Sequence, residues 1–423
     1  MEPVTATGAA RARTQMADRA RTAPEMADRE SGPAVLLTVE QLLRPVPGGI
    51  GTYIRGLLQG LGDGPGDRPT VEPDGGDGAR RAHEAAAPSV ALLSARGKPE
   101  VDGSWPVHVS PLSVGALTRA WDLGILRAPR NADVVHATSL AFPLPGRGRP
   151  LVVTVHDLAW RELPGTFTRR GRRWHEQALL RALRCAHRFV VPSTATADAL
   201  MAMGVVPATI EVIEHGVDHL APPDAEGASA LLRRLGVSGP YVVAVGTVEP
   251  RKNLARLRQA HARVRSALAE PVSLVVVGPA GWAAGATGTG AGGQNAAVPA
   301  TPGTDGTVFT GAVGAGVLSG LISRAICLAY VPLHEGFGLP ALEAMSLGTP
   351  VVASPIPSAG DAALAVDPLD ADDIARGLAA VLSDEGLRSD LVARGRERAR
   401  RHRWADAAAA HLALWASLAG GTR

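Results

Sequence analysis

Short, continuous runs of valine, leucine and isoleucine alternate with helix-like patterns along most of this chain of 423 residues. A strand that is apolar at every position must be covered on both faces, which is typical of parallel sheets flanked by helices. Alternation of such strands with helices indicates repeated βαβ units. The chain is therefore expected to belong to the α/β class.

The apolar runs form two series, which predict two Rossmann-like domains. The first series occupies 34–39, 90–93, 107–110, 134–136, 151–155, 189–191 and 210–213, and the second occupies 241–245, 274–277, 307–309, 326–330 and 351–353. Open α/β sheets bind ligands at the carboxyl ends of their strands, so the two domains are expected to face each other across a cleft. The predicted divisions are a disordered tail at 1–32, a first domain at 33–217, a linker with one short helix at 218–238, a second domain at 239–402 and a C-terminal helix and tail at 403–423.

Composition narrows the class of protein. Hydrophobic residues make up 46% of the chain and charged residues 20%, as in ordinary globular proteins. No apolar run reaches the ~18 residues that span a membrane, and the N-terminus lacks an apolar signal core, so a cytoplasmic location is expected. Cys185 and Cys327 are expected to be buried free thiols. The glycine-rich segments 62–87 and 283–306 are expected to be flexible surface loops.

The segment 334–348 combines two carboxylates with a turn and a helix. Glu335 and Glu343 flank a Gly-Phe-Gly turn, and Pro340 suits the first helical position, where its missing N–H costs nothing. Gly348 suits the position just after the last helical turn. Glu335 is expected before the helix and Glu343 in its first turn, so that one faces a sugar and the other a ribose with a diphosphate between them.

The turn itself is a candidate phosphate site. The backbone N–H groups of Gly338 and Leu339 would point out of a helix N-terminus, where they have no partner within the helix. Gly336 and Phe337 complete the turn. A lone pair of glutamates would carry little information, but glycines, proline and acids together fit one geometry.

Glycines also follow the first expected strand. In the stretch 47–53, Gly49 and Gly51 would let the backbone approach a ligand closely. A nicotinamide or flavin fingerprint would require a third glycine where Ile54 stands, so a dinucleotide-dependent oxidoreductase is a poor second interpretation. After the run 151–155 comes His156, either a structural histidine held by a carbonyl or a donor to a sugar hydroxyl or phosphate; its place at a strand end favours the second.

Arg251 and Lys252 lie just after the first strand of the second series, which ends at Gly246. Arginine can clamp two phosphate oxygens while lysine acts as a mobile point charge, so this pair is a candidate diphosphate site. The alternative is a solvated basic turn. The glutamate segment in the same half of the chain favours the diphosphate.

Together these motifs resemble those of the retaining, metal-independent glycosyltransferases of the GT-B fold, specifically family 4, over roughly 34–418. The segment from Glu335 to Glu343 resembles the E-x7-E signature of that family, and the glycines at 48–51, His156 and Lys252 resemble its other conserved elements. Three departures stand out: Thr247 where many members have arginine, a short 355–360 segment and the long 283–306 insert. Arg251 is expected to replace the arginine missing at 247, as in the branch with a Glu-Pro-Arg-Lys-Asn string, which often transfers mannose.

The resemblance implies a set of roles. The donor would be a nucleoside-diphosphate sugar, the acceptor a glycan or lipid-linked molecule bound by the first domain, and no metal or other cofactor would be needed. The C-terminal helix would cross back onto the first domain. The expected catalytic residues are His156, Glu335, Arg251 and Lys252, and the expected donor-binding residues are Gly49, Gly51, Gly246, Thr310, Gly311, Gly336, Phe337, Gly338, Leu339 and Glu343.

Other features have competing interpretations. Asp370 and Asp372 match the letters of a metal-binding Asp-x-Asp motif, but they precede a helical pattern, so helix capping is the better explanation. Seven arginines gather between 169 and 188, either on a solvated helix or on a patch for anionic membrane lipid at the inner face of the cell membrane. Aromatic residues make up only 4% of the chain, so no nucleic-acid partner is expected. A catalytically silent GT-B scaffold is the alternative function.

Overall fold

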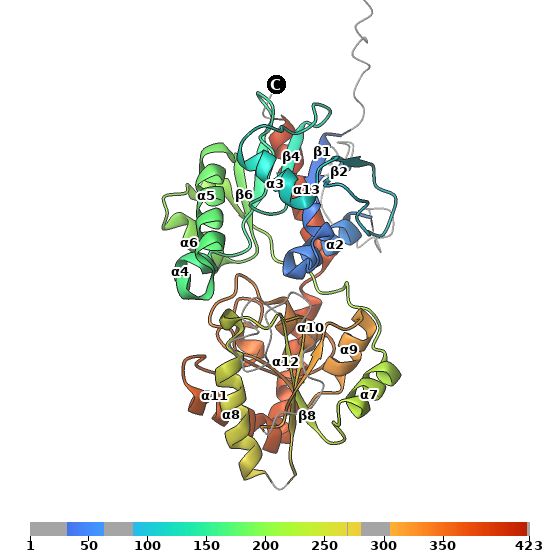
Figure 1. The fold of residues 1–423 in the computed structure, drawn as a ribbon, viewed down its shortest axis with the longest axis vertical. Helices are drawn as coiled ribbons and strands as arrows, with labels where there is room; N and C mark the ends of the chain where they lie inside the picture. Colours follow the sequence, from blue (N-terminus) through green and yellow to red (C-terminus); the bar gives the residue numbers. More distant parts are fainter. Residues whose placement is uncertain (1–31, 63–87, 269, 281–304, 421–423) are drawn as a thin grey trace, which may run out of the picture.

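The computed structural model describes residues 32–62, 88–268, 270–280 and 305–420, and these form two lobes stacked along the long axis (Figure 1). Apart from a few end residues, the predicted tail and the predicted loops 62–87 and 283–306 lie outside the described residues. Each lobe contains one parallel sheet covered by helices. The predicted α/β class and its two facing domains are confirmed.

The sheet of the first lobe has seven strands within the described ranges, all parallel, in the order β3-β2-β1-β4-β5-β6-β7. Every run of the first apolar series forms a strand, with ends within one residue of those expected. The strands are β1 Ala34–Thr38, β2 Ser89–Ser94, β3 Val107–Val109, β4 Val134–Ala137, β5 Leu151–Thr154, β6 Arg188–Val191 and β7 Ile210–Val212.

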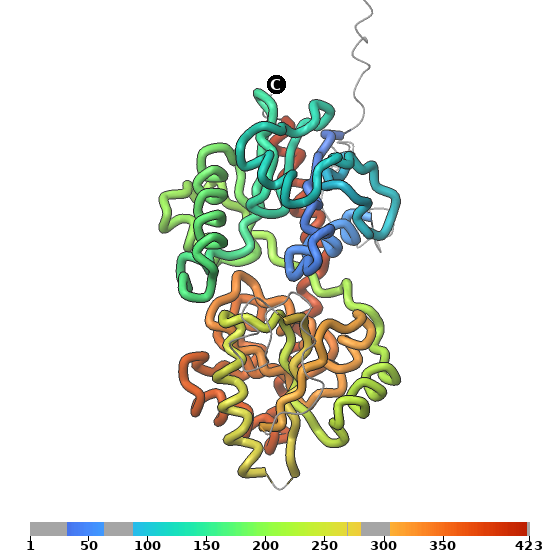
Figure 2. Tube along the Cα trace, in the orientation of Figure 1, coloured from blue at the N-terminus to red at the C-terminus, as the bar shows by residue number. Residues whose placement is uncertain are grey.

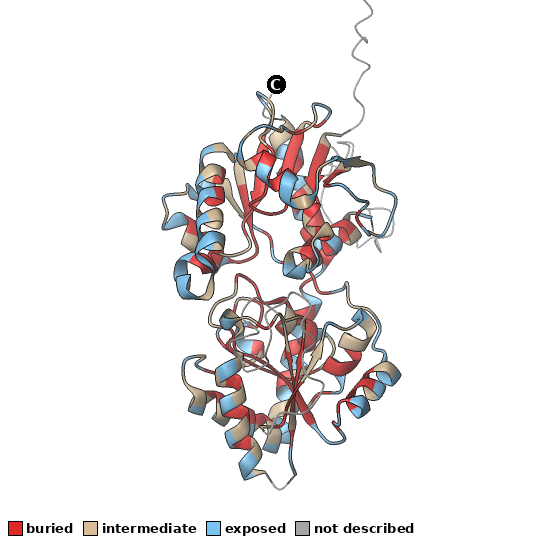
Figure 3. Cartoon of the chain, viewed as in Figure 1, coloured by how far each residue is buried: buried red, intermediate tan, exposed pale blue. Residues whose placement is uncertain are grey.

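Alternation along β1 shows why this sheet has a core on each face. Leu36 packs with α3 and α5 on one side, whereas Val35 and Leu37 pack with α2 and α13 on the other. The sheet is consequently buried and its helices expose their outer faces (Figure 3). The main helices are α2 Gly48–Gly62, α3 Val114–Asp122, α5 Arg169–Cys185, α6 Thr194–Met201 and α13 Trp404–Gly420.

The second lobe repeats this plan with a sheet in the order β10-β9-β8-β11-β12-β13 over the described residues. Its strands are β8 Tyr241–Val245, β9 Ser273–Val277, β10 Thr307–Gly311, β11 Cys327–Tyr330, β12 Val351–Ala353 and β13 Leu364–Ala365. Its helices are α7 Ala225–Arg234, α8 Leu254–Ala267, α9 Ala315–Ser323, α10 Leu339–Ser346, α11 Ala371–Ser383 and α12 Glu385–Arg400. β13 was not predicted, because two residues are too few to form a pattern. The short helix expected between 218 and 238 is α7, and it packs on the core of this lobe.

The chain passes between the lobes twice, and the two passages run side by side (Figure 2). The Val217 N–H donates to the His402 carbonyl at 3.0 Å, which joins them. Beyond this point α13 returns along α2 and packs in the core of the first lobe. Tyr53 Oη lies 2.9 Å from His411 Nε2, and Trp415 Nε1–H donates to His136 Nδ1 at 3.2 Å. The predicted return of the C-terminal helix is confirmed.

The two cysteines are free thiols. Cys327 is buried, and burial raises the pKa of its thiol to about 12. Cys185, the last residue of α5, is only partly buried, so the expectation of full burial was wrong for it. No helix in the described part of the chain has the length and apolar character needed to span a bilayer.

Candidate functional site

The loops at the carboxyl ends of the two sheets touch each other. A Cβ added to Gly336 would lie 1.7 Å from the carbonyl oxygen of His156, so only glycine permits this contact. Ser193 Oγ donates to the Gly336 carbonyl at 2.6 Å, and His334 Nδ1 lies 2.7 Å from Glu162 Oε2. The glutamate segment of the second lobe therefore lies against the strand-end loops of the first.

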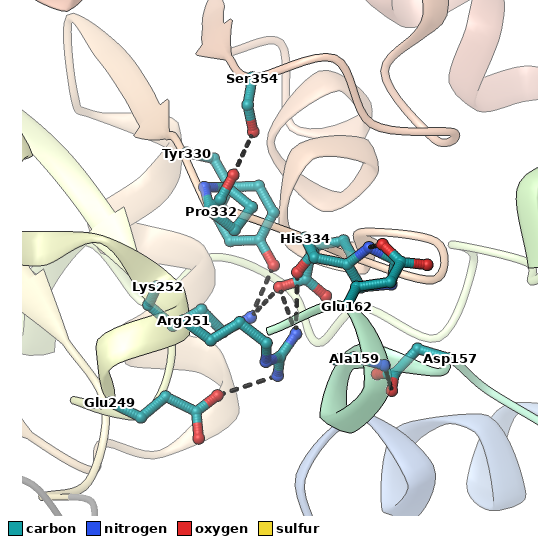
Figure 4. Close-up of polar contacts among 11 residues, drawn as sticks. Asp157, Ala159, Glu162, Glu249, Arg251, Lys252, Tyr330, Pro332, His334 and Ser354 are labelled. Atoms are coloured by element: carbon teal, nitrogen blue, oxygen red, sulfur yellow. Dashed lines mark hydrogen bonds and ion pairs between the residues drawn. The ribbon is translucent and has the colours of Figure 1, made fainter. Parts of the chain in front are cut away.

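A compact ionic cluster lies at this edge of the second sheet (Figure 4). Lys252 Nζ lies 2.5 Å from Glu335 Oε1, and Arg251 Nη1 lies 3.0 Å from the same oxygen. Lys252 also donates to the hydroxyl of Tyr330, the last residue of β11, at 2.8 Å. Residues expected from two separate motifs thus meet, and a tyrosine that was not predicted joins them.

Further contacts hold Arg251 in place. Its Nη2 donates to Glu249 Oε1 at 2.9 Å and its Nη1 donates to the His334 carbonyl at 3.1 Å. Two cations and two carboxylates therefore share this edge, and their formal charges cancel. The cluster would recognise an anion through local N–H donors and not through an excess of positive charge.

The ionisation of Glu335 depends on these neighbouring cations. Burial alone would raise its pKa, but Lys252 and Arg251 outweigh burial and lower the pKa to about 2. Burial would likewise lower the pKa of Arg251, but the charges of Glu335, Asp157 and Glu249 raise it. The pKa of Tyr330 is raised well above its usual value, first by burial and then by Glu335. At neutral pH the carboxylate and the guanidinium are ionised and the phenol is neutral.

Local backbone geometry explains how Lys252 and Arg251 reach this edge. Gly246 directly follows β8, and its φ of +144° excludes most side chains. The short helix Pro250–Lys252 ends at Asn253, which has a φ of +59°. The amide of Asn253 donates to the Val331 carbonyl at 3.0 Å and to the Pro368 carbonyl at 2.7 Å, which fixes the turn between neighbouring strands.

The helix α10 begins where the sequence predicted, although its phase differs slightly. Gly338 caps it with a φ of +98°, and the first helical residue is Leu339. Pro340 is thus the second helical residue, and Glu343 lies in the second turn and not in the first. Gly348 ends the helix as expected, with a φ of +77° and an N–H bonded to the Met345 carbonyl.

Glu343 is nearly buried and has one polar side-chain partner among the described residues. Its Oε1 lies 3.2 Å from His219 Nε2, and its side chain is 10% exposed. His219 Nδ1 in turn accepts from the indole N–H of Trp404 at 3.0 Å. The second glutamate of the segment is therefore held from the crossing between the lobes, apart from the ionic cluster.

His156 is held more firmly than expected. Its Nε2 lies 2.9 Å from the Thr138 carbonyl, and burial lowers the pKa of the ring. A neutral ring that donates from Nε2 leaves Nδ1 as an acceptor only. The predicted donation to a sugar or phosphate is therefore not available from this side chain, which would instead accept a hydrogen bond from a hydroxyl.

The remaining residues expected to bind the sugar donor are of two kinds: those that offer mainly backbone atoms and those whose side chains are buried in the core. Gly49 and Gly51 form the first turn of α2 instead of a loop, and a side chain at Gly49 would meet nothing within 4 Å. Thr310 and Gly311 end β10, with the Thr310 hydroxyl donating to the Gly311 carbonyl at 2.7 Å. The ring of Phe337 is buried and lies edge-on to His215 at 5.0 Å, so only its backbone is left to meet a ligand.

Sequence reasoning missed three polar residues near these edges: Tyr330, His219 and Glu40. Glu40 follows β1 by two residues and is fully buried, and burial raises its pKa to about 7. Within the described part of the chain, one of its oxygens has no hydrogen-bond partner. Its place directly after a strand end was the available signal, as was that of Tyr330 as the last residue of a strand. No local pattern marks His219.

The competing metal motif is resolved as a helix cap. The Asp370 carboxylate accepts from the Asp372 N–H at 2.8 Å at the start of α11. Across the residues that the structure describes, no group of three or more histidine, cysteine, aspartate or glutamate side chains is placed to hold a metal ion.

Two family models match this chain, and they divide it between the lobes. The model described as glycosyltransferase family 4 matches residues 47–219, and the model of glycosyl transferases group 1 matches residues 233–398. The first match covers most of the first lobe, and the second covers the ionic cluster and α10.

Individual proteins similar to this chain are also glycosyltransferases. The D-inositol 3-phosphate glycosyltransferase of Salinispora arenicola is 31% identical over 323 residues, which cover 67% of this chain and 70% of that protein. The O-antigen chain mannosyltransferase B of Escherichia coli is 29% identical over 270 residues, 62% of this chain and 69% of that protein.

Solved structures with the same fold include sucrose-phosphate synthase from Thermosynechococcus elongatus, with a TM-score of 0.65 and 19% identity over 92% of this chain and 100% of that one. The Anabaena protein Alr3699/HepE in complex with UDP-glucose gives a TM-score of 0.60 and 17% identity over 90% of this chain and 98% of that one. At these identities the likeness establishes the GT-B fold alone.

Proposed function

This chain belongs to the group 1 glycosyltransferases of family 4, and on that premise we propose that it is a retaining, metal-independent hexosyltransferase that uses a nucleoside-diphosphate sugar. The observation that carries the proposal is the cluster of Arg251, Lys252 and Glu335 beside the N-terminus of α10. Mannose is the favoured sugar, in keeping with the Glu-Pro-Arg-Lys-Asn string and with the similarity to a mannosyltransferase.

The leaving diphosphate gains negative charge as the bond to the sugar breaks. Arg251 and Lys252 lie within hydrogen-bond reach of one carboxylate oxygen, so their spare N–H groups converge on a small volume. The N–H groups at the start of α10 add fixed partial positive charge nearby. Donors held in place before the reaction stabilise developing charge without the cost of reorganising water.

The carboxylates would divide the donor between them. Glu335 would accept hydrogen bonds from hydroxyls of the transferred sugar, and its low pKa keeps it ionised for this task. Glu343 would accept from the ribose, and the end of β10 at Thr310 and Gly311 would face the nucleobase. We assign no nucleophile to Glu335, because the leaving phosphate would act as base in a front-face attack by the acceptor.

The acceptor would bind at the edge of the first lobe, where the His156 ring is neutral. A glycan or a lipid-linked acceptor suits such a surface. The arginines of α5 divide into two groups: Arg181 is paired with Asp122 at 3.2 Å, whereas Arg169, Arg170, Arg172, Arg173 and Arg184 are exposed. The exposed group would meet anionic lipid at the inner face of the membrane.

A panel of GDP-mannose, UDP-glucose, UDP-N-acetylglucosamine and ADP-glucose tests the proposal. One donor should be hydrolysed or transferred, and the activity should persist in EDTA. Loss in EDTA with recovery in manganese or magnesium would overturn metal independence. Tight nucleotide binding without turnover of any donor would favour the alternative, a catalytically silent GT-B scaffold.

The role of Arg251 has a matched control. Arg251→Ala should weaken binding of the preferred nucleoside diphosphate about tenfold or more and leave nucleoside binding unchanged, because a charge-assisted hydrogen bond contributes ~1.5–3 kcal/mol. Glu249→Gln removes a carboxylate that competes for the same guanidinium, so diphosphate affinity should hold or rise. Equal losses for nucleoside and diphosphate in Arg251→Ala would indicate a folding defect, and no loss in either would leave Arg251 a structural cation.

A further inference from the structure

Glu343 is held by a hydrogen-bonded relay that starts in the helix crossing between the lobes. The indole N–H of Trp404 donates to His219 Nδ1 at 3.0 Å, and His219 Nε2 lies 3.2 Å from Glu343 Oε1. These residues are separated by 185 and 124 positions in the sequence, so only the tertiary structure brings them together. The relay joins the first residue of α13 to a residue of α10.

The direction of the relay follows from chemistry. An indole N–H can only donate, so His219 Nδ1 must accept, and the ring proton resides on Nε2. That proton then points at the Glu343 carboxylate. Trp404 therefore selects the histidine tautomer that donates to Glu343, and a ring with the other tautomer would present a lone pair to a carboxylate.

Trp404 is held in place by burial and by close contacts with its neighbours. It is fully buried, and a Cβ at Gly56 would lie 2.0 Å from its indole ring, while a Cβ at Gly216 or Gly60 would lie 2.2 or 2.3 Å from its backbone. Its backbone N–H donates to Asp218 Oδ1 at 2.7 Å. These contacts hold the backbone of Trp404, and the close approach of Gly56 packs its indole beside His219.

The other end of the relay leaves a functional group free to act. His219 engages Oε1 of Glu343. Oε2 accepts no hydrogen bond within the described residues and is not sealed from solvent. A carboxylate clamped at one oxygen presents the other in a fixed direction. Orientation of this kind is what a positioning residue supplies to a binding group.

We infer that His219, held in one tautomer by Trp404, is a positioning residue that orients Glu343 toward the ribose of a nucleoside-diphosphate ligand. This inference rests on the proposed function, because it takes the ribose as the partner of Glu343. His219 belongs to the segment that joins the lobes, and Trp404 to the helix that returns between them. Recognition of ribose is thereby tied to the correct seating of α13 on the first lobe.

The test measures discrimination between ribose and deoxyribose, which a merely structural residue would not change. Calorimetry identifies the tightest of GDP, UDP and ADP for the full chain, and the same method then measures its 2′-deoxy and 3′-deoxy forms. The wild-type protein should prefer the ribose form about tenfold. His219→Ala should reduce that preference to about twofold and leave the affinity for the deoxy form nearly unchanged.

Three further single variants and one double variant separate positioning from folding. His219→Gln keeps an N–H donor toward Glu343 and should restore most of the preference. Trp404→Phe keeps an aromatic ring at this position but has no N–H for His219 Nδ1. His219 can then adopt either tautomer, and the ribose preference should fall about threefold. Glu343→Gln should abolish the preference, and adding His219→Ala to it should change nothing more. Thermal melts identify any variant that fails to fold, and the folded member of the His219 pair then decides.

The outcomes separate this inference from the function on which it rests. Full ribose preference in folded His219→Ala, or additive losses in the double variant, would overturn the relay while nucleotide binding stands. A wild-type protein that binds the nucleotide without preferring ribose would overturn it too. Failure of all three nucleotides to bind the wild-type protein would instead overturn the proposed function, and the relay with it.

Discussion

The first lobe buries a group of neutral histidine rings near the carboxyl edge of its sheet, together with the carboxyl of Glu40, whereas the second lobe buries an ionised carboxylate beside two cations. Burial lowers the pKa of His136, His156 and His215 and lowers that of His411 to about 4. The second lobe instead buries Glu335 with a pKa of about 2 beside two cations. One architecture thus supports two opposite ways of burying polar groups.

The difference follows from the partners that each edge supplies. Around Tyr53 the partners are neutral: its hydroxyl lies 3.2 Å from Thr154 Oγ1 and 2.9 Å from His411 Nε2, and His136 stacks on His411 at 5.3 Å. Without counter-charges, desolvation keeps these histidines neutral. In the second lobe Lys252 and Arg251 compensate the carboxylate. A neutral edge suits a neutral acceptor, and an edge with ionised donors suits a diphosphate.

The largest expected effect comes from removing the shared carboxylate. Glu335→Ala should lower turnover about 100- to 1000-fold, because an interaction formed mainly in the transition state contributes ~3–4 kcal/mol. Diphosphate affinity should hold or rise, since Arg251 and Lys252 lose a competing anion. Steady-state kinetics and calorimetry measure the two quantities separately.

The control for this variant is Glu249→Gln, which removes the other carboxylate bonded to Arg251. Its turnover should stay within about threefold of the wild-type value. If Glu335→Ala kept full turnover, the charged edge would be structural and the contrast between the lobes would say nothing about catalysis.

Much of the fold was predictable because its signals are local. The continuous apolar runs at β1, β8 and β12 specify strands covered on both faces, and each formed within one residue of the expected ends. Gly348 marks the end of α10 because a left-handed residue is required there. β13 escaped prediction, since its two residues pair through the sheet edge and not through their own pattern.

The site was predictable only where its residues lie in motifs. Glu335, Arg251 and Lys252 stand at strand ends within recognisable strings, and the structure brings them together. Tyr330 and His219 belong to no such string, and their roles arise from packing between distant segments. Glu343 was expected in the first turn and lies in the second, because the Gly338-Leu339-Pro340 start leaves the first helical residue ambiguous by about one position.

The next largest effect should be a difference between the two lobes in how far low pH reduces their stability. His411 has a folded pKa of about 4, below the usual 6.5, so its contribution to stability is complete above pH 6.5 and is lost as the pH falls toward 4. That shift corresponds to about 3 kcal/mol. Glu335 keeps its contribution above pH 4.5 and loses it only as the pH falls through 2. Between pH 6.5 and 5 the first lobe should weaken more than the second, because burial lowers the pKa of several histidines there and that of His261 in the second lobe; Glu40, with a pKa of about 7, offsets part of the loss in the first lobe.

Hydrogen exchange measured by mass spectrometry at pH 7.5 and pH 5.5, corrected for intrinsic rates, checks this order. Peptides of α2, β4 and α13 should lose protection while those of β8 and β11 keep theirs. His411→Gln removes one titrating ring and should reduce the acid sensitivity of the first lobe. Equal loss of protection in both lobes would contradict the assignment of neutral and ionised edges.

The next largest effect should come from disrupting the contact between the strand-end loops of the two lobes. Gly336→Ala places a Cβ against the His156 carbonyl, so the lobes must separate slightly. Transfer should fall about tenfold because the reacting groups are misplaced, while nucleotide binding, which uses the second lobe, stays within about twofold. Ser193→Ala removes the 2.6 Å hydrogen bond to Gly336 without a clash and is the matched control, with a smaller loss. A proportional loss of nucleotide binding in Gly336→Ala would show that the two edges do not act separately.

The smallest effect concerns the neutral hydroxyl of Tyr330, which joins the ionic cluster. Tyr330→Phe removes the oxygen that accepts from Lys252 Nζ at 2.8 Å but keeps the ring, whose centre lies 5.0 Å from that nitrogen. One hydrogen bond contributes ~1 kcal/mol, so diphosphate affinity should fall about fivefold. Tyr241→Phe is the control, because its hydroxyl donates to the Leu321 carbonyl at 2.7 Å in the core of the same lobe. It should cost stability without changing affinity. Equal losses of affinity in both variants would mean that packing of the lobe governs binding, whereas no loss in Tyr330→Phe would mean that Glu335 alone positions Lys252.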